Sequence, residues 1–214
     1  MAVYSYVVRY DVGFAPNPYF GVCSLATCKP EIRKRAQVDD WIVGTGSAEH
    51  GQEGKLVFAM LVDEIITFDD YWQDPRFASK RPRMGLSHKI AHGDNIYHRD
   101  NVGAWQQEDS RHSFQDGSPN PGHIRTDTGV DRILLGRRFV YFGVDGPQVP
   151  RHLRDDFGFD FVHARRGYRK RFTDEHVTAI VEWLASLGTG VRGRPREWPH
   201  LEVTTGRLAS QDGA

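Results

Sequence analysis

The sequence predicts an α+β protein built on a small, bent, barrel-like mixed sheet, with a long loop insertion and a C-terminal helix. Three observations indicate this fold class: strand-like segments dominate the first part of the chain, a long polar stretch follows them, and one amphipathic helix lies near the end. Closing a bent sheet into a small barrel hides its edges and leaves a mouth for one flat ligand.

The N-terminal elements come first. Residues 3–10 (VYSYVVRY) are β-branched and aromatic with partial alternation, which predicts a strand. The loop DVGFAPNPYFG is rich in proline and glycine and must be an ordered turn. Residues 29–37 predict a short helix, because Pro30 suits the first turn and basic residues gather at the end. DDWIVGTGS then predicts a second strand.

Two further strand segments lie on either side of the long polar stretch. Residues 55–68 form an apolar run that predicts a long strand, bent near Asp63 and Glu64. Residues 131–142 predict two short strands around Gly136, as a hairpin or a bulged pair. These segments complete the predicted sheet.

The C-terminal helix is the clearest single element. Thr173 suits the N-cap of DEHVTAIVEWLASLG, whose apolar residues recur at helical spacing, and Gly188 ends it. We expect residues 1–150 to form the core domain, with residues 69–129 as a polar, aromatic insertion or lid. Residues 151–214, a basic segment with the helix and a tail, are expected to pack on the same domain.

Composition excludes several classes of protein. The chain has 28 Lys and Arg against 28 Asp and Glu, which argues against a wholly basic nucleic-acid binder and against an acidic disordered chain. There is no apolar run of about 18 residues and no secretory signal pattern, so we expect a soluble, cytoplasmic protein. Cys23 and Cys28 are expected to be reduced, one of them as a small buried apolar residue, because no zinc ligands stand beside them.

Several specific strings resemble one known family. VVRYDVGFAPNPYFGVCSLATCKPEIRKRA, DDWIVGTGS, DDYWQDPRF, HGDNIYH and ILLGRRFVYFG are similar to nucleotide modification associated domain 2, a family of bacteria and phages linked to systems that alter DNA bases. The resemblance covers Val3 to Pro150. It implies a role beside nucleic-acid modification.

A more distant resemblance concerns the order of elements. The helix EIRKRAQ, followed by DDWIVGTGS and KLVFAMLVDEIITFDDYW, resembles the PUA-like superfamily, whose EVE, ASCH and YTH-type members are compact barrels with a nucleobase pocket. Such folds enter the second strand through Gly-Asp, whereas here Asp39 precedes Asp40. We therefore expect Asp39 to adopt a turn conformation that glycine reaches more easily.

The segment HKIAHGDNIYHRD gathers polar side chains that suit either a nucleotide pocket or ordinary loop hydrogen bonding. His88 and His92 are four residues apart, as metal ligands on one helix face can be, but Gly93 argues against a helix. We expect neither a metal nor another cofactor here, although the sequence leaves a metal role for His88, His92 and His98 open.

The pocket hypothesis rests on Asn95, because its amide offers a donor and an acceptor together, the pattern of a base edge. Stacking of a base on an aromatic ring is worth about 1–3 kcal/mol. Trp41 is expected in the core instead. The predicted base-binding residues are Asn95, Tyr97, Trp72, Trp105 and Asn17.

Candidates for acid-base catalysis are Asp11, Asp94 and His98. Arg9 and Asp11 lie two residues apart along the first strand and loop, so they face the same side. A cation beside a carboxylate serves proton transfer, but it is also an ordinary surface ion pair. Asp94 can also accept a hydrogen bond from the exocyclic amine of a base.

A basic run in the C-terminal segment is the predicted phosphate contact, although most such runs are solvated faces. Its residues are Arg165, Arg166, Arg169, Lys170 and Arg171, interleaved with aromatic side chains. The glycines at 44 and 46 lack the spacing of a phosphate-binding loop, so a turn is expected there.

Three functions follow in order of preference. The first is recognition of a nucleobase, modified or plain, or of a nucleotide, with DNA preferred as the nucleic acid. The second is an enzyme of base or nucleotide modification that uses acid-base residues in the same pocket. The third is a scaffold that binds partner proteins of a DNA-modification system through the C-terminal helix. No membrane partner is expected.

Overall fold

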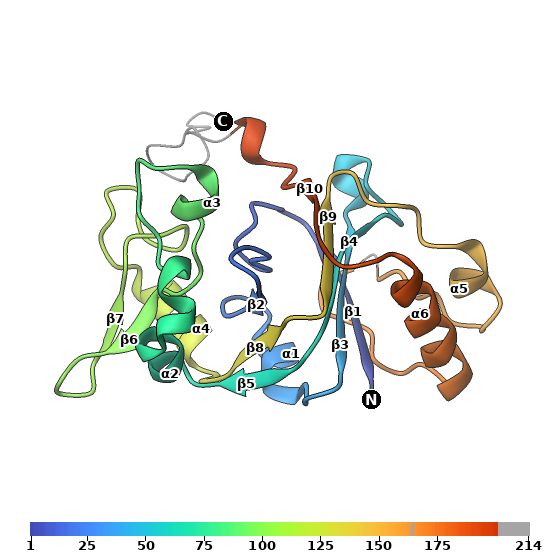
Figure 1. The fold of residues 1–214 in the computed structure, drawn as a ribbon, viewed down its shortest axis with the longest axis horizontal. Coiled ribbons are helices and arrows are strands. Elements are labelled where there is room, and N and C mark those ends of the chain that lie inside the picture. Colours follow the sequence, from blue (N-terminus) through green and yellow to red (C-terminus); the bar gives the residue numbers. More distant parts are fainter. Residues whose placement is uncertain (164, 201–214) are drawn as a thin grey trace.

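Two β-sheets form the centre of the computed structural model, which describes residues 1–163 and 165–200 (Figure 1). The larger sheet has five strands in the order β1, β3, β4, β9, β10. Only β4 runs against the direction of the other strands of this sheet. The bounds are Val3–Val8 for β1, Trp41–Gly46 for β3, Leu56–Leu61 for β4, Phe139–Gly143 for β9 and Gly190–Arg194 for β10.

The smaller sheet contains β2 (Cys23–Leu25), β8 (Ile133–Gly136) and β5 (Glu64–Ile66), all antiparallel. The chain leaves the large sheet after β4 and enters the small one at Glu64, which confirms the predicted bend. The two strands around Gly136 are also confirmed. Their predicted pairing is wrong: β8 pairs with β2 and β5, and β9 pairs with β4 and β10.

The expected barrel does not form within the described residues. The large sheet ends at β1 and β10, and the small sheet ends at β2 and β5, so neither sheet closes. The bend after Leu61 carries the chain from the large sheet into the small one, and the bend after Gly136 carries it back, so the large sheet does not curl round on itself. The fold is therefore a mixed α+β structure with open sheets.

Side chains of the large sheet alternate between two apolar layers, as the period of a strand requires. In β1, Val3 belongs to the layer that contains Ile180 and Leu184 of the C-terminal helix, and Tyr4 belongs to the layer with Cys23 of β2. Figure 1 shows α5 and α6 on one side of the large sheet and β2, β8 and α1 on the other. The sheet is thus covered on both faces.

The predicted helices are present. Helix α1 spans Pro30–Arg35, and α6 spans Asp174–Ser186 with the Thr173 side chain accepting a hydrogen bond from the amide of His176. Asp39 has a φ of 70°, which confirms its turn conformation. The sequence did not predict β2, β10 or α5 (Arg151–Asp155), which are short or glycine-rich.

The expected loop insertion is instead a folded unit. Asp70 and Thr67 cap α2 reciprocally, and Phe68 and Tyr71 of that helix are buried in a third apolar cluster. The helices and strands of this folded unit are too short for a hydrophobic period to be seen in the sequence. The helices and strands here are α2 (Phe68–Gln73), α3 (His88–Ala91), β6 (Tyr97–Arg99), β7 (Trp105–Gln107) and α4 (Pro121–Thr128). The 3-10 turns of the chain are Ala48–His50, Pro75–Lys80 and Trp198–His200.

The C-terminal segment is joined to the large sheet. Strand β10 pairs with β9, and α6 packs on the sheet face opposite α1. Residues 201–214 of the predicted tail lie outside the described residues. None of the helices described in residues 1–163 and 165–200 is both long and apolar enough to cross a bilayer.

Candidate functional site

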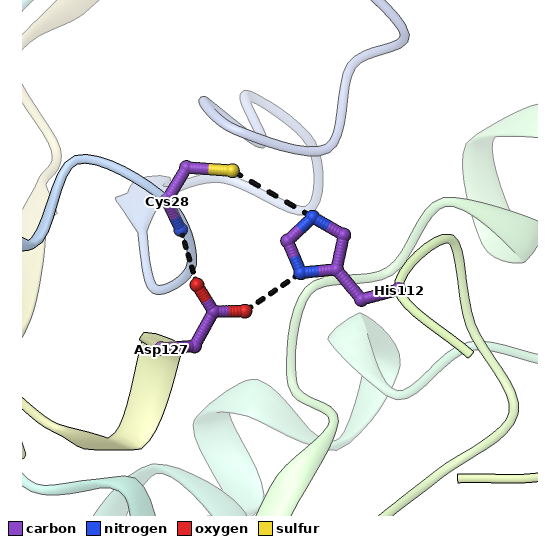
Figure 2. A group of neighbouring side chains, drawn as sticks. All are labelled: Cys28, His112 and Asp127. Carbon is purple, nitrogen blue, oxygen red and sulfur yellow. Dashed lines mark hydrogen bonds and ion pairs between the residues drawn. The ribbon is translucent and has the colours of Figure 1, made fainter. Parts of the chain in front are cut away.

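Three side chains that are far apart in the sequence meet beside the N-terminus of α1: Cys28, His112 and Asp127 (Figure 2). The thiol Sγ of Cys28 lies 3.6 Å from Nε2 of His112. On the other side of the imidazole, Nδ1 lies 2.6 Å from Oδ2 of Asp127. The second carboxylate oxygen, Oδ1, accepts the amide hydrogen of Cys28 at 2.9 Å. The three residues therefore form a closed ring of contacts.

The backbone presents the thiol in a strained loop. Cys28 has a φ of 57° and Lys29 a φ of 42°, both in the left-handed region. For residues with a side chain this region costs on the order of 1 kcal/mol or more each, and such strain gathers at functional sites. Pro30 then begins α1. Cys28 is half-buried, whereas Cys23 is completely buried.

A buried arginine fixes this loop against the end of α4. Nε of Arg33 donates to the carbonyl of Cys28 at 2.9 Å, and Nη2 donates to the carbonyl of Asp127 at 2.6 Å. Nη1 reaches the carbonyls of Val130 and Arg132. The fixed fork of a guanidinium suits this set of acceptors. Arg33 is a positioning residue, since it holds two members of the ring through their backbone.

A second group of side chains supports the carboxylate. The Tyr97 hydroxyl donates to Oδ2 of Asp127 at 2.9 Å, and Nε2 of Gln107 donates to the Tyr97 oxygen at 3.0 Å. The ring of His112 contacts Phe14 edge-on at 4.8 Å and stacks on His123 at 4.0 Å between centroids. The imidazole of His112 is thus held by the aromatic rings of Phe14 and His123 as well as by the carboxylate of Asp127.

The electrostatic interactions among Cys28, His112 and Asp127 favour an ion pair between Asp127 and His112. Burial lowers the pKa of His112, but the hydrogen bonds with Asp127 and Cys28 raise it more, to about 9. Burial raises the pKa of Asp127, yet the contact with His112 and the amide of Cys28 bring it below its usual range. His112 is therefore charged at neutral pH, and its Nε2 faces the Cys28 sulfur.

The same three residues are of the types that ligate zinc, so a metal role needs a test against the geometry. Both oxygens of Asp127 already accept hydrogen bonds, and Nδ1 of His112 faces that carboxylate. Of the possible metal-binding atoms of these three side chains, only Sγ of Cys28 and Nε2 of His112 are not in contact with each other through the carboxylate, and these two atoms face each other directly. Structural zinc sites use four protein ligands and catalytic sites three. The arrangement suits nucleophilic catalysis better, in which a base activates a thiol and a third group orients the base.

The structure places predicted site residues Asp94 and Asn17 in a buried polar network. The Lys80 ammonium donates to Oδ1 of Asn17 and to Oγ of Ser24, both at 2.8 Å. Ser24 donates to Asp94 at 2.6 Å, and Tyr71 donates to the other oxygen of Asp94 at 2.8 Å. Burial raises the pKa of Asp94 and lowers that of Lys80. All five are completely buried, so the network joins the N-terminal loop to the insertion rather than facing solvent.

Asn95 is also completely buried, and its amide nitrogen donates to the carbonyls of Tyr71 and Phe77. Tyr97 is buried against Asp127, as described above. A base reaches Asn95 only if this part of the core opens. Base binding by these residues stays a prediction.

Trp72, Trp105 and His98 lie nearer the surface. The Trp72 ring stacks on His98 at 4.2 Å, and the Arg81 guanidinium lies 3.9 Å from its centroid. Nε2 of His98 lies 3.0 Å from Glu108. Trp105 contacts Phe68 edge-on and carries the Arg99 guanidinium on its ring. The structure brings Trp72 and His98 together, but not with Asn95 in one open pocket.

Asp11 lies at the edge of the large sheet where β1, β3 and β9 end. It lines a small, shallow cleft together with Arg9, His50 and Arg196. Burial raises the pKa of Asp11 to about 6, against hydrogen bonds from the Tyr141 hydroxyl and backbone amides. Arg9 pairs with Glu49, not with Asp11. Proton transfer by Asp11 therefore stays a prediction.

The predicted phosphate-binding residues lie between α5 and α6, and phosphate binding by them stays a prediction. Arg169 donates to the carbonyl of Asp160 and lies over Phe159, and Lys170 lies over Tyr4. Arg165, Arg166 and Arg171 are exposed. Arg166 lies close enough to Lys29, the neighbour of Cys28, for the two charges to act on each other.

The sequence does not reveal the grouping of Cys28, His112 and Asp127, because these residues are distant in the chain. His112 lies in the string DSRHSF and Asp127 in RTDTG, both within the insertion interpreted as a loop. Cys28 lay in ATCKP, one of the strings that carried the family resemblance, but was interpreted as a structural thiol. Only the fold brings the three together.

The fold and site define a mixed α+β protein with a largely buried group of contacts between Cys28, His112 and Asp127. Residues 1–202 match nucleotide modification associated domain 2, so the chain belongs to this family. The match extends beyond the Val3 to Pro150 region expected from the resembling strings and includes α6 and β10. Neither the curated proteins nor the solved structures gave a match. Membership of the family indicates involvement in nucleotide modification, and the PUA-like resemblance receives no support.

Proposed function

We propose that this protein is a thiol-dependent enzyme of nucleotide modification, with Cys28 as the nucleophile. The observation that carries the proposal is the ring of contacts from Sγ of Cys28 to His112 and on to Asp127. A scaffold protein has no need of an imidazolium beside a half-buried thiol in a strained loop. The family's link to nucleotide modification supports a nucleotide as the substrate, and we propose that it is either free or within DNA.

Each residue of the ring has a distinct role. The Cys28 thiolate forms a bond to an electrophilic carbon of the substrate, and the bond from that carbon to a leaving nitrogen or oxygen breaks. The imidazolium of His112 gives the proton at Nε2 to the leaving group, and Asp127 holds Nδ1. The neutral imidazole then takes a proton from water, which attacks the same carbon and releases the thiolate. An acceptor amine or alcohol in place of water makes the reaction a transfer.

The first test compares the two cysteines of one chain. Burial raises the pKa of Cys23 to about 12, so this thiol is the internal control. We expect iodoacetamide at pH 7 to alkylate Cys28 at least tenfold faster than Cys23, measured by mass spectrometry of the separated peptides. His112→Ala should slow the reaction of Cys28 alone. A Cys28 rate equal to that of the unfolded chain would contradict the proposal.

The second test measures the reaction itself. Plain and base-modified oligonucleotides and free nucleotides are incubated with the protein, and substrate and protein masses are then recorded. We expect a mass change in one substrate that requires Cys28 and survives Cys23→Ala. Trapping of the substrate on Cys28 identifies the covalent intermediate.

Recognition of a nucleobase without chemistry is the second candidate. The observation that favours it is the pair of half-buried tryptophans, Trp72 and Trp105, on the outer face of the insertion. Under this alternative an oligonucleotide binds and its mass stays unchanged, and Trp72→Ala weakens binding where Cys28→Ala does not. The two proposals therefore predict different masses for the recovered oligonucleotide and different residues whose substitution has an effect.

A further inference from the structure

A half-buried lysine adjoins the thiol and has no carboxylate partner among the residues that the structure describes. Nζ of Lys29 lies 4.4 Å from the centroid of the Tyr6 ring, and it donates a long hydrogen bond, 3.5 Å, to the carbonyl of Val7. The charged groups that act on it are the Cys28 thiol and another cation, Arg166. Burial lowers the pKa of Lys29, and Arg166 adds to this effect. Partly buried cations are normally compensated by an anion.

The groups around Lys29 come from a separate part of the chain. His163 and Arg166 belong to the segment between α5 and α6, and Nε2 of His163 lies 3.4 Å from the carbonyl of Arg166. Burial lowers the pKa of His163, and the charges of Arg169, Lys29 and Arg165 lower it further, so this imidazole is a neutral donor at neutral pH. Two distant segments thus bring the cations Lys29 and Arg166 and the neutral imidazole of His163 near Cys28.

Unsatisfied polar atoms lie in the same region. The Tyr6 hydroxyl is buried and has no hydrogen-bond partner, and its nearest ionisable neighbours include Cys28. Nδ1 of His163 and Oγ1 of Thr27, the residue before Cys28, are also buried without a partner. Buried polar groups are rarely left unpaired, and such groups mark a place where a ligand supplies the missing bonds.

We propose that Lys29, His163 and Arg166 hold a phosphate group of the substrate beside Cys28. This proposal rests on the thiol-dependent function proposed above. It adds that the protein recognises the substrate through its phosphate group. The ammonium and guanidinium supply the charge and the donors that phosphate oxygens require. The phosphate belongs either to a free nucleotide or to a nucleic-acid strand, since the chemistry of recognition is shared.

The test measures protection of Cys28 from iodoacetamide, a neutral reagent whose attack does not depend on anion binding. Three probes are compared at two salt concentrations: a nucleoside, the corresponding nucleoside monophosphate and a single-stranded oligonucleotide. We expect the nucleotide or the oligonucleotide to slow alkylation at least fivefold, and the nucleoside not to. Protection by the monophosphate identifies a free nucleotide, and protection by the oligonucleotide alone identifies a strand. Equal effects of nucleoside and nucleotide would overturn the proposal.

Matched variants separate this site from other charges. Lys29→Met should raise the concentration of probe needed for half protection about tenfold, with protection measured relative to the variant's own unprotected alkylation rate. Lys34→Met, an exposed lysine of the same helix, should leave both values unchanged. Arg166→Gln is compared in the same way with Arg125→Gln. If alkylation of Cys28 is slow without any probe, the proposed function fails; if it is fast but no phosphate probe protects, only the phosphate site fails.

Discussion

Asp127 orients the imidazole of His112 so that Nε2 faces the thiol of Cys28. The contact of 2.6 Å between Oδ2 and Nδ1 fixes the plane of the imidazole, and the other carboxylate oxygen accepts the amide hydrogen of Cys28 itself. One carboxylate therefore positions both the imidazole and the loop that carries the thiol.

Asp127→Asn tests this relationship. The amide keeps the size of the carboxylate but removes the charge that raises the pKa of His112, so less imidazolium is present at pH 7. We expect Cys28 to be alkylated roughly tenfold more slowly, with the pH at half-maximal rate displaced. The measurement is the alkylation rate between pH 5 and 10. Asp156→Asn on the exposed end of α5 is the control and should behave as the wild type.

The pH dependence of stability reports the same ion pair. The pKa of His112 is about 9 in the folded protein against an ordinary 6.5, so its contribution is complete below pH 6.5 and is lost as pH rises to 9. That loss is on the order of 3 kcal/mol. Urea unfolding at pH 6 and 9.5 should show it in the wild type and not in His112→Gln.

The groups that face His112 are Cys28, Asp127 and the stacked ring of His123, and each changes charge in its own range. His123→Ala is therefore measured alongside. An equal loss of stability in wild type and His112→Gln over this window would show that another group carries the effect.

The parts of the molecule that the sequence predicts are those whose signals are local. Thr173 caps α6 and Asp39 takes a left-handed turn because these preferences act within a few residues. The bend between β4 and β5 also follows from local composition. Strand β10 could not be predicted, since GVRGR gains its structure by pairing with β9.

The site depends on long-range placement instead. His112 lies 84 residues from Cys28 along the chain, and no spacing rule links them. Asn95 shows why residue type is ambiguous: an amide suited to a base edge is equally suited to donate to two backbone carbonyls in a core. Residue type alone does not distinguish these uses.

Asp11→Asn should change the stability profile on the acidic side. Burial raises the pKa of Asp11 to about 6, so ionising it costs stability as pH rises from about 4 to 6. The asparagine can still accept from Tyr141 but has no charge to bury. We expect the variant to gain on the order of 2 kcal/mol relative to wild type between pH 4 and pH 7. Urea unfolding at both pH values measures the difference, and parallel profiles would contradict it.

The buried network predicts a non-additive pair of variants. Lys80→Met removes the cation and leaves the Asp94 carboxylate buried without it, which should destabilise the fold by about 3–5 kcal/mol. The double variant Lys80→Met with Asp94→Asn should cost less than the sum of the single changes. Chemical unfolding of all four proteins gives the coupling. Additive losses would show that the ammonium and carboxylate act independently.

Arg33→Lys addresses the link between stability and the site. A lysine keeps the charge but lacks the fork that reaches the carbonyls of Cys28 and Asp127 together. We expect a loss of about 3 kcal/mol in the free energy of unfolding, because buried carbonyls lose their donors. The Cys28 alkylation rate should fall as well, since the loop loses its anchor. Arg35→Lys is the control on the same helix, because Arg35 is exposed and pairs with Glu31. Equal stability of the two variants would show that the Arg33 contacts do not hold the loop, and a normal alkylation rate in a destabilised Arg33→Lys would show that they serve the fold alone.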